Sequence, residues 1–172
     1  MQLTCVDLSI AAGALVAYQA RPDASHRFAL ARSTPELLVS LDSTQETFDV
    51  VDIFCHGFGG GMTFGGETLF AADGYGYERL PSFTRLVRPG GRLRLLGCAT
   101  ASDSTWKEGR VRLRGAALLE AVASRLDGGS AWGTTARLSF LDYLPTGLDD
   151  ERARGRLISH RETHRTPSAK SL

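Results

Sequence analysis

The chain has 172 residues, of which 42% are hydrophobic, enough to form the core of one globular domain. Its 20 basic and 19 acidic side chains leave a formal net charge of +1, which argues against bulk attraction to nucleic acid or to anionic lipid. No run approaches the roughly 18 apolar residues that a membrane-spanning helix needs. We therefore expect a single soluble domain that binds neither nucleic acid nor a membrane.

Cysteine and histidine spacing gives no sign of a disulfide framework or a metal site. Cys5, Cys55 and Cys98 are odd in number and irregularly spaced, and no Cys-x-x-Cys pair occurs. His160 and His164 stand four residues apart without an evident third ligand. We therefore expect free thiols, no metal, no other cofactor and a reducing, cytoplasmic location.

The first twenty residues, MQLTCVDLSIAAGALVAYQA, have a weak likeness to a secretion signal. They lack a basic leading region, and Asp7 interrupts the apolar stretch, so we do not expect a signal peptide. The first predicted helix begins further on, at Ser33-Thr34-Pro35-Glu36. Thr34 suits the N-cap and Pro35 the first helical position.

Two later segments have the pattern of buried strands. The first, Phe48 to Cys55 (FDVVDIFC), is short, β-branched and aromatic, and the second, Arg92 to Cys98 (RLRLLGC), follows the turn signal Pro89-Gly90-Gly91. Between them lie a glycine-rich hairpin, Gly57 to Gly66, and a predicted helix, Glu78 to Leu86. Apolar runs bounded by glycine are typical of central strands covered by helices.

The remaining pattern predicts a helix over Gly115 to Leu126 and a strand over Ser130 to Thr134. Alternation of strands and helices favours an α/β sandwich with a mostly parallel sheet. We place this domain at residues 1–147. Residues 148–172 hold few large apolar side chains, and from Glu151 onward there are six basic residues and only two acidic ones. We expect them to form a basic, partly disordered tail.

Both predicted central strands end at a residue able to do catalysis, one at His56 and the other at Cys98. Because the carboxyl ends of parallel strands open onto one edge of a sheet, adjacent strands would bring the two side chains together. A cysteine attacks a carbonyl as its thiolate, and a neighbouring imidazole then protonates the leaving amine. Backbone amides stabilise the developing oxyanion, and a glycine such as Gly57 lets the substrate approach closely.

This order of motifs is similar to that of the caspase-like (clan CD) cysteine peptidases, which include caspases, gingipains, separases and CHAT domains. The closest likeness is to bacterial CHAT-type and related domains, through HGFGGGMTFGG, YERLPSFTRLV, LLGCATA and GAALLEAVASRL. The resemblance covers roughly Phe48 to Thr135, about half of the chain.

The resemblance implies a three-layer caspase-like sandwich with a mostly parallel central sheet flanked by helices. It also implies a cysteine endopeptidase with His56 as general base, Cys98 as nucleophile, and the amides of Gly57 and Cys98 as the oxyanion hole. Its substrate would be a protein or peptide. The chain is short for a complete peptidase of this type, so substrate-binding loops are missing or supplied by a regulatory protein partner. Relatives that cleave after basic residues carry an acid in the specificity pocket, for which Asp52, Asp73 and Asp103 are the candidates here.

Two alternatives stay open. Some relatives are inactive, so the chain is alternatively a silent protein-binding module with the same fold. The run His56-Gly57-Phe58-Gly59-Gly60 also resembles the oxyanion turn of an α/β-hydrolase esterase, but that fold needs a Gly-x-Ser-x-Gly elbow or its cysteine variant, which this chain lacks. Cys55 alternates to the opposite face of its strand from His56, and we expect both Cys55 and Cys5 to be core residues.

Overall fold

The computed structural model describes residues 1–106, 111–138, 142–144 and 147–161. It is an α/β fold built on a mixed, mostly parallel sheet of six strands in the order β13-β10-β7-β3-β1-β2. The five strands from β2 to β10 are parallel, and β13 alone is antiparallel, at one edge. The strands are β1 (Gln2–Asp7), β2 (His26–Ala31), β3 (Phe48–Phe54), β7 (Val87–Leu95), β10 (Ser130–Thr134) and β13 (Leu157–Arg161).

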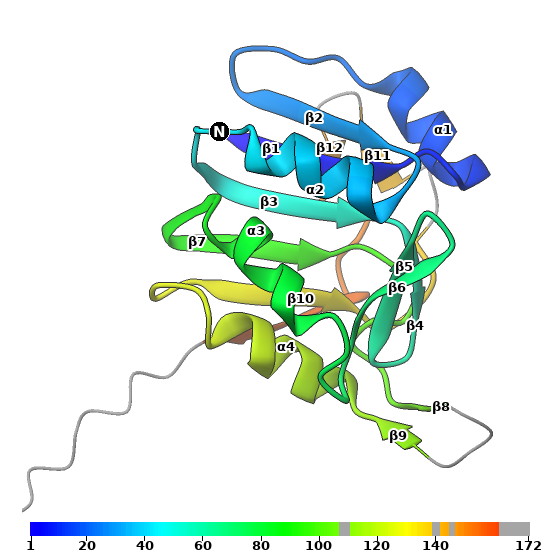
Figure 1. The fold of residues 1–172 in the computed structure, drawn as a ribbon. Helices are drawn as coiled ribbons and strands as arrows, with labels where there is room; N and C mark the ends of the chain where they lie inside the picture. Colours follow the sequence, from blue (N-terminus) through cyan, green and yellow to red (C-terminus); the bar gives the residue numbers. More distant parts are fainter. Residues whose placement is uncertain (107–110, 139–141, 145–146, 162–172) are drawn as a thin grey trace, which may run out of the picture.

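Each face of this sheet has its own apolar cluster. One face is covered by α2 (Thr34–Asp42), α3 (Leu80–Thr84) and α4 (Gly115–Ala123), as Figure 1 shows. The other face packs against α1 (Ala11–Gln19) and the hairpin of β11 (Tyr143–Leu144) and β12 (Gly147–Leu148). Because side chains alternate along a strand, β3 sends Val51 and Ile53 to the first face and Phe54 to the second.

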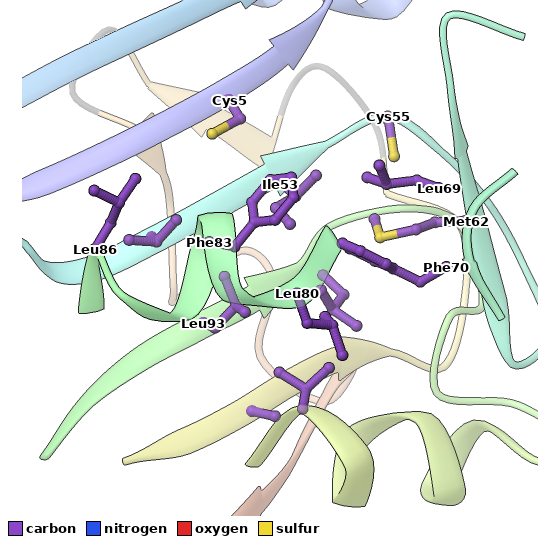
Figure 2. Packing of buried hydrophobic residues seen from close by; sticks show 14 of the residues in the cluster. Cys5, Ile53, Cys55, Met62, Leu69, Phe70, Leu80, Phe83, Leu86 and Leu93 are labelled. Atoms are coloured by element: carbon purple, nitrogen blue, oxygen red, sulfur yellow. The ribbon is translucent and has the colours of Figure 1, made fainter. Parts of the chain in front are cut away.

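Aromatic and branched side chains fill the larger apolar cluster, which lies on the first face of the sheet. Phe83 of α3 packs edge-on against Phe70, with ring centroids 5.4 Å apart. Figure 2 shows Leu80 and Phe83 directed from α3 toward Ile53 and Leu93 of the sheet. This apolar contact explains why the short α3 is stable despite having only 5 residues.

Several predicted elements form with shifted ends. Ser33, not Thr34, is the N-cap of α2, and its hydroxyl accepts a hydrogen bond from the amide of Glu36 at 3.4 Å. The Thr34 hydroxyl donates instead to the carbonyl of Phe64. The helix expected over 78–86 is a 3₁₀ turn, η1 (Tyr77–Arg79), followed by α3.

Two small antiparallel sheets lie beyond the carboxyl ends of β3 and β7 (Figure 1). The glycine-rich segment forms β4 (His56–Phe58), β5 (Gly61–Phe64) and β6 (Glu67–Ala71), a three-stranded sheet rather than a single hairpin. The second sheet pairs β8 (Ser104–Trp106) with β9 (Val111–Leu113).

The ends of the chain differ from the expectation. Residues 2–31 supply β1, α1 and β2, none of which the pattern predicted. Part of the expected tail belongs to the domain, since β13 pairs with β10 and Ala153 is fully buried. His160 lies on β13 opposite Ala131, whereas His164 and the rest of 162–172 lie outside the described residues. No helix in the described part of the chain is long and apolar enough to cross a membrane.

Candidate active site

The strands β3 and β7 are parallel neighbours, and their register brings His56 and Cys98 to the same edge of the sheet. Ile53 is the register partner of Leu95, and the amide of Leu96 donates to the carbonyl of Ile53 at 2.8 Å. His56 follows Ile53 by three residues, and Cys98 follows Leu95 by three. Cys98 stands in a turn beyond the last paired residue of β7.

Two glycines hold the histidine and cysteine segments in direct backbone contact. A Cβ added to Gly57 would overlap the amide nitrogen of Cys98, and one added to Gly97 would lie 2.7 Å from the Cα of Gly57. Neither position has room for a side chain, because both obstructions are main-chain atoms. The close approach therefore depends on glycine at both positions and places the backbone of the His56–Gly57 segment beside that of Gly97–Cys98.

His56 and Cys98 line one cleft of about 390 Å³ at this edge. The His56 side chain is exposed and Cys98 is half-buried, so a molecule entering the cleft can reach both. The cleft lies between the ends of the two strands and the start of α1. Its other lining residues are Ser9, Ile10, Ala11, Ala12, Phe54, Cys55, Leu96, Arg137 and Leu138.

Two buried threonines fix the turn that carries Cys98. The Thr100 hydroxyl donates to the carbonyl of Leu95 at 2.9 Å and accepts from the amide of Thr134 at 3.0 Å. The Thr134 hydroxyl donates to the carbonyl of Gly97 and accepts from the amide of Thr100. Both threonines are fully buried, so these hydrogen bonds tie the cysteine turn to the end of β10 without competition from water.

The backbone around the sulfur suits the stabilisation of an oxyanion. Among the described residues the amide of Cys98 donates no backbone hydrogen bond, and its nitrogen lies against the backbone of Gly57. Ala99 has a φ of 56°, a left-handed conformation that is uncommon for a residue with a side chain. Strain of this kind is concentrated at functional sites, where the surrounding hydrogen bonds maintain it.

The other two thiols are core residues. Cys5 and Cys55 are buried, and Figure 2 shows the Cys55 side chain above Leu69 and Met62. Burial raises the pKa of the Cys5 thiol, and the nearby carboxylate of Asp52 raises it further. Burial also raises the pKa of Cys55, with a smaller contribution from Asp7.

Asp52 does not lie in the cleft, and its carboxylate is fully occupied elsewhere. It is completely buried on β3 and forms a two-point ion pair with Arg94 of β7, at 2.6 and 2.8 Å. Gln2 and Thr4 donate to the same carboxylate. An acid with these partners has no free oxygen for a substrate cation, so the suggestion that Asp52 forms a substrate pocket was wrong.

Asp73 and Asp103 also lie outside the cleft lining. Asp73 is exposed in the turn after β6 and accepts from the amide of Tyr75. Asp103 accepts from the amide of Gly115 at 3.2 Å and lies 3.4 Å from Arg112, so it holds the start of α4 and β9. The structure therefore brings no carboxylate among the described residues to the cleft surface.

Several residues that build the cleft were not identified from the sequence. Asp7 accepts from the amides of Ser9 and Gly65, which ties the start of α1 to the turn between β5 and β6. Arg137, which follows β10, is exposed and is the one arginine among the described lining residues, which include no lysine, aspartate or glutamate. No motif in the sequence marks either residue, because both depend on contacts with distant segments.

No protein-family model, no curated protein and no solved structure matches this chain.

Proposed function

We propose that this chain is a cysteine endopeptidase of the caspase-like type, with His56 and Cys98 as its catalytic dyad. The observation that carries the proposal is the cleft in which an exposed imidazole and a half-buried thiol follow neighbouring parallel strands. A histidine and a cysteine at a sheet edge are the two groups that nucleophilic acyl transfer requires.

The reaction would proceed through a covalent intermediate. The Cys98 sulfur attacks the carbonyl carbon of the scissile bond, while His56 takes the thiol proton and delivers it to the leaving amine. The Cys98 and Gly57 amides stabilise the oxyanion of the tetrahedral intermediate. In the second half, His56 takes a proton from water, the hydroxide attacks the thioester, and the Cys98 thiol leaves with that proton.

The mostly parallel sheet, with helices α2, α3 and α4 on one face and α1 on the other, supports assignment to the caspase-like sandwich. The two smaller sheets follow the histidine and cysteine segments and therefore border the cleft side of the domain. We further propose that they contribute to substrate binding.

Arg137 indicates which peptides the cleft would prefer. An exposed guanidinium in a cleft without a lining carboxylate favours an anionic group on the bound peptide. The N-terminus of α1, where Ile10 is the N-cap and Ala11 the first helical residue, adds the positive end of a helix dipole to the same cleft. We therefore propose cleavage next to an acidic residue, not next to a basic one.

The test is covalent labelling by thiol-reactive peptide ketones that carry Asp, Arg or Leu beside the reactive carbonyl. We expect one adduct per chain, located at Cys98 by peptide mapping, and none in Cys98→Ala. His56→Ala should slow labelling by about 10²-fold or more, because the imidazole no longer takes the thiol proton. His160→Ala, on the far strand β13, is the matched control and should label normally.

Two results would contradict the proposal. One is labelling of Cys98 at the same rate in wild type and His56→Ala, which would show a merely accessible thiol. The other is the absence of any adduct across the panel, which would favour the non-catalytic protein-binding module.

A further inference from the structure

A second cavity, of about 260 Å³, lies over β7, β10 and β13 and shares no lining residue with the His56–Cys98 cleft. The strands supply four of its residues, and the turns just before β13 supply the others. Nothing in the proposed peptidase reaction uses this cavity. Its lining residues are Arg92, Arg94, Trp132, Asp150, Glu151, Arg154, Gly155 and Leu157.

The apolar part of the cavity is a fixed aromatic surface. Trp132 is half-buried on β10, and its indole nitrogen donates to the hydroxyl of Ser130 at 3.0 Å, which restrains the ring. Leu157 of β13 completes the apolar lining. A restrained indole of this kind stacks well against another flat ring system.

The charged part of the cavity contains three arginines and two acidic residues, Asp150 and Glu151. Arg94 is buried and fully paired, with Asp52 on one side and Asp150 at 2.6 Å on the other. Burial opposes its charge, but Asp52 holds the pKa of Arg94 above its ordinary value. Arg92 and Arg154 are exposed, and neither forms an ion pair with a described residue.

We propose that this cavity binds a purine nucleoside monophosphate, with the base stacked on Trp132 and the phosphate between Arg92 and Arg154. Guanidinium groups bind phosphate oxygens with strong, charge-assisted hydrogen bonds. The Glu151 carboxylate, on the same lining, accepts hydrogen bonds from an exocyclic amine such as that of adenine. The cavity volume of about 260 Å³ is slightly below the roughly 300 Å³ of the smallest typical small-molecule sites. This size favours a mononucleotide over a larger dinucleotide.

Titration with adenosine monophosphate tests the proposal. Binding is measured by tryptophan fluorescence in a Trp106→Phe background. The chain has two tryptophans, so this background leaves emission from Trp132 alone. We expect saturable quenching by the nucleotide, and binding of inorganic phosphate or adenosine that is weaker by at least about ten-fold, since each carries only half of the recognised groups. Calorimetry gives the same comparison without a fluorophore and is applied to the Trp132→Leu variant.

The double variant Arg92→Glu/Arg154→Glu should bind the nucleotide at least about ten-fold more weakly. Arg32→Glu/Arg114→Glu changes the net charge equally at exposed sites elsewhere and should bind as wild type does. Because calorimetry reads binding directly, this result is independent of whether the dyad is active. Absence of saturable binding at millimolar nucleotide, or equal weakening in both double variants, would overturn the proposal.

Discussion

The strands β3 and β7 carry two polar pairs, Asp52–Arg94 and His56–Cys98, separated by four residues on each strand. The first pair lies within the sheet, is almost completely buried and makes a two-point ion pair. The second lies beyond the paired residues, in a cleft open to solvent. The same two strands thus present one pair that is neutralised by its partners and one that remains free to react.

The difference shows how position along a strand decides the role of a polar residue. Inside the sheet, a charge must be matched by hydrogen bonds, and Asp52 receives them from Arg94, Gln2 and Thr4. Beyond the last ladder bond, polar groups line an open cleft instead. The interior pair therefore holds the strands together, and the edge pair is the one available for chemistry.

The largest expected difference between core and edge is in thiol reactivity. Iodoacetamide at pH 7.5 should modify Cys98, while Cys5 and Cys55 react only after unfolding and so at least about 10³-fold more slowly. Peptide mapping of the alkylated protein measures all three rates. Modification of Cys55 as fast as Cys98 in the folded protein would contradict the separation of core from cleft.

The same two buried thiols set a pH dependence of stability. Their raised pKa values mean that the folded protein retains protons that the unfolded chain releases above about pH 8.5. The contribution of these thiols to the free energy of unfolding should therefore be fully present below that pH and decrease as pH rises from 8.5 to 10. Urea unfolding at several pH values measures the slope, and Cys55→Ala should reduce it.

The interior pair should matter for stability in proportion to its burial. Asp52→Ala leaves Arg94 buried without its main partner and should lower the free energy of unfolding by about 3–5 kcal/mol. Asp49→Ala, on the same strand, removes exposed pairs with Arg88 and with the N-terminal ammonium group, and should cost about 1 kcal/mol or less. Equal losses in the two variants would show that the interior pair contributes no more than a surface contact.

The sequence predicted the elements whose pattern is local. The boundaries of β3 and β10 follow from apolar runs that end at glycine or threonine, and α2 from its proline and capping residues. The three N-terminal elements were missed for a physical reason. One face of β1 carries Gln2 and Thr4, which serve the buried Asp52 network, and α1 is apolar on all sides, so neither shows the usual periodicity.

The site was predictable only in part, because its roles depend on distant contacts. His56 and Cys98 stand out as chemistry-bearing residues at strand ends, and the parallel register brings them to one cleft. Asp52 was one of three candidates for the substrate pocket, and nothing near it in the sequence reveals Arg94 as its partner 42 residues away. The edge strand β13 was missed because most of its side chains are exposed and it lacks an apolar alternation.

A smaller loss of stability is expected from removing one of the buried hydrogen bonds that position Cys98. An exposed threonine variant serves as the comparison. Thr134→Val removes a buried hydroxyl bonded to the Gly97 carbonyl and should lower the free energy of unfolding by about 1–3 kcal/mol. It should also slow ketone labelling of Cys98, because the turn is no longer fixed. Thr47→Val, at an exposed position just before β3, should change neither quantity. A Thr134→Val variant that labels normally would show that the turn keeps its geometry without this bond.

The smallest effect concerns the charge of the cleft. Arg137→Glu should reduce the labelling rate of the Asp-bearing ketone relative to the Arg-bearing one by about ten-fold, close to 1.4 kcal/mol of binding free energy. The ratio of the two rates is the measured quantity, so a general loss of reactivity does not affect it. An unchanged ratio would remove Arg137 from substrate selection while leaving the dyad intact.

Hydrolysis itself tests the central claim most directly. A mixed peptide library is incubated with wild type, Cys98→Ala, His56→Ala and Asp49→Ala, and new peptide termini are identified by mass spectrometry. We predict new termini with wild type and Asp49→Ala, enriched next to acidic residues, and none above background with Cys98→Ala or His56→Ala. The same termini in all four samples, or none in any, would contradict a catalytic role for the edge pair.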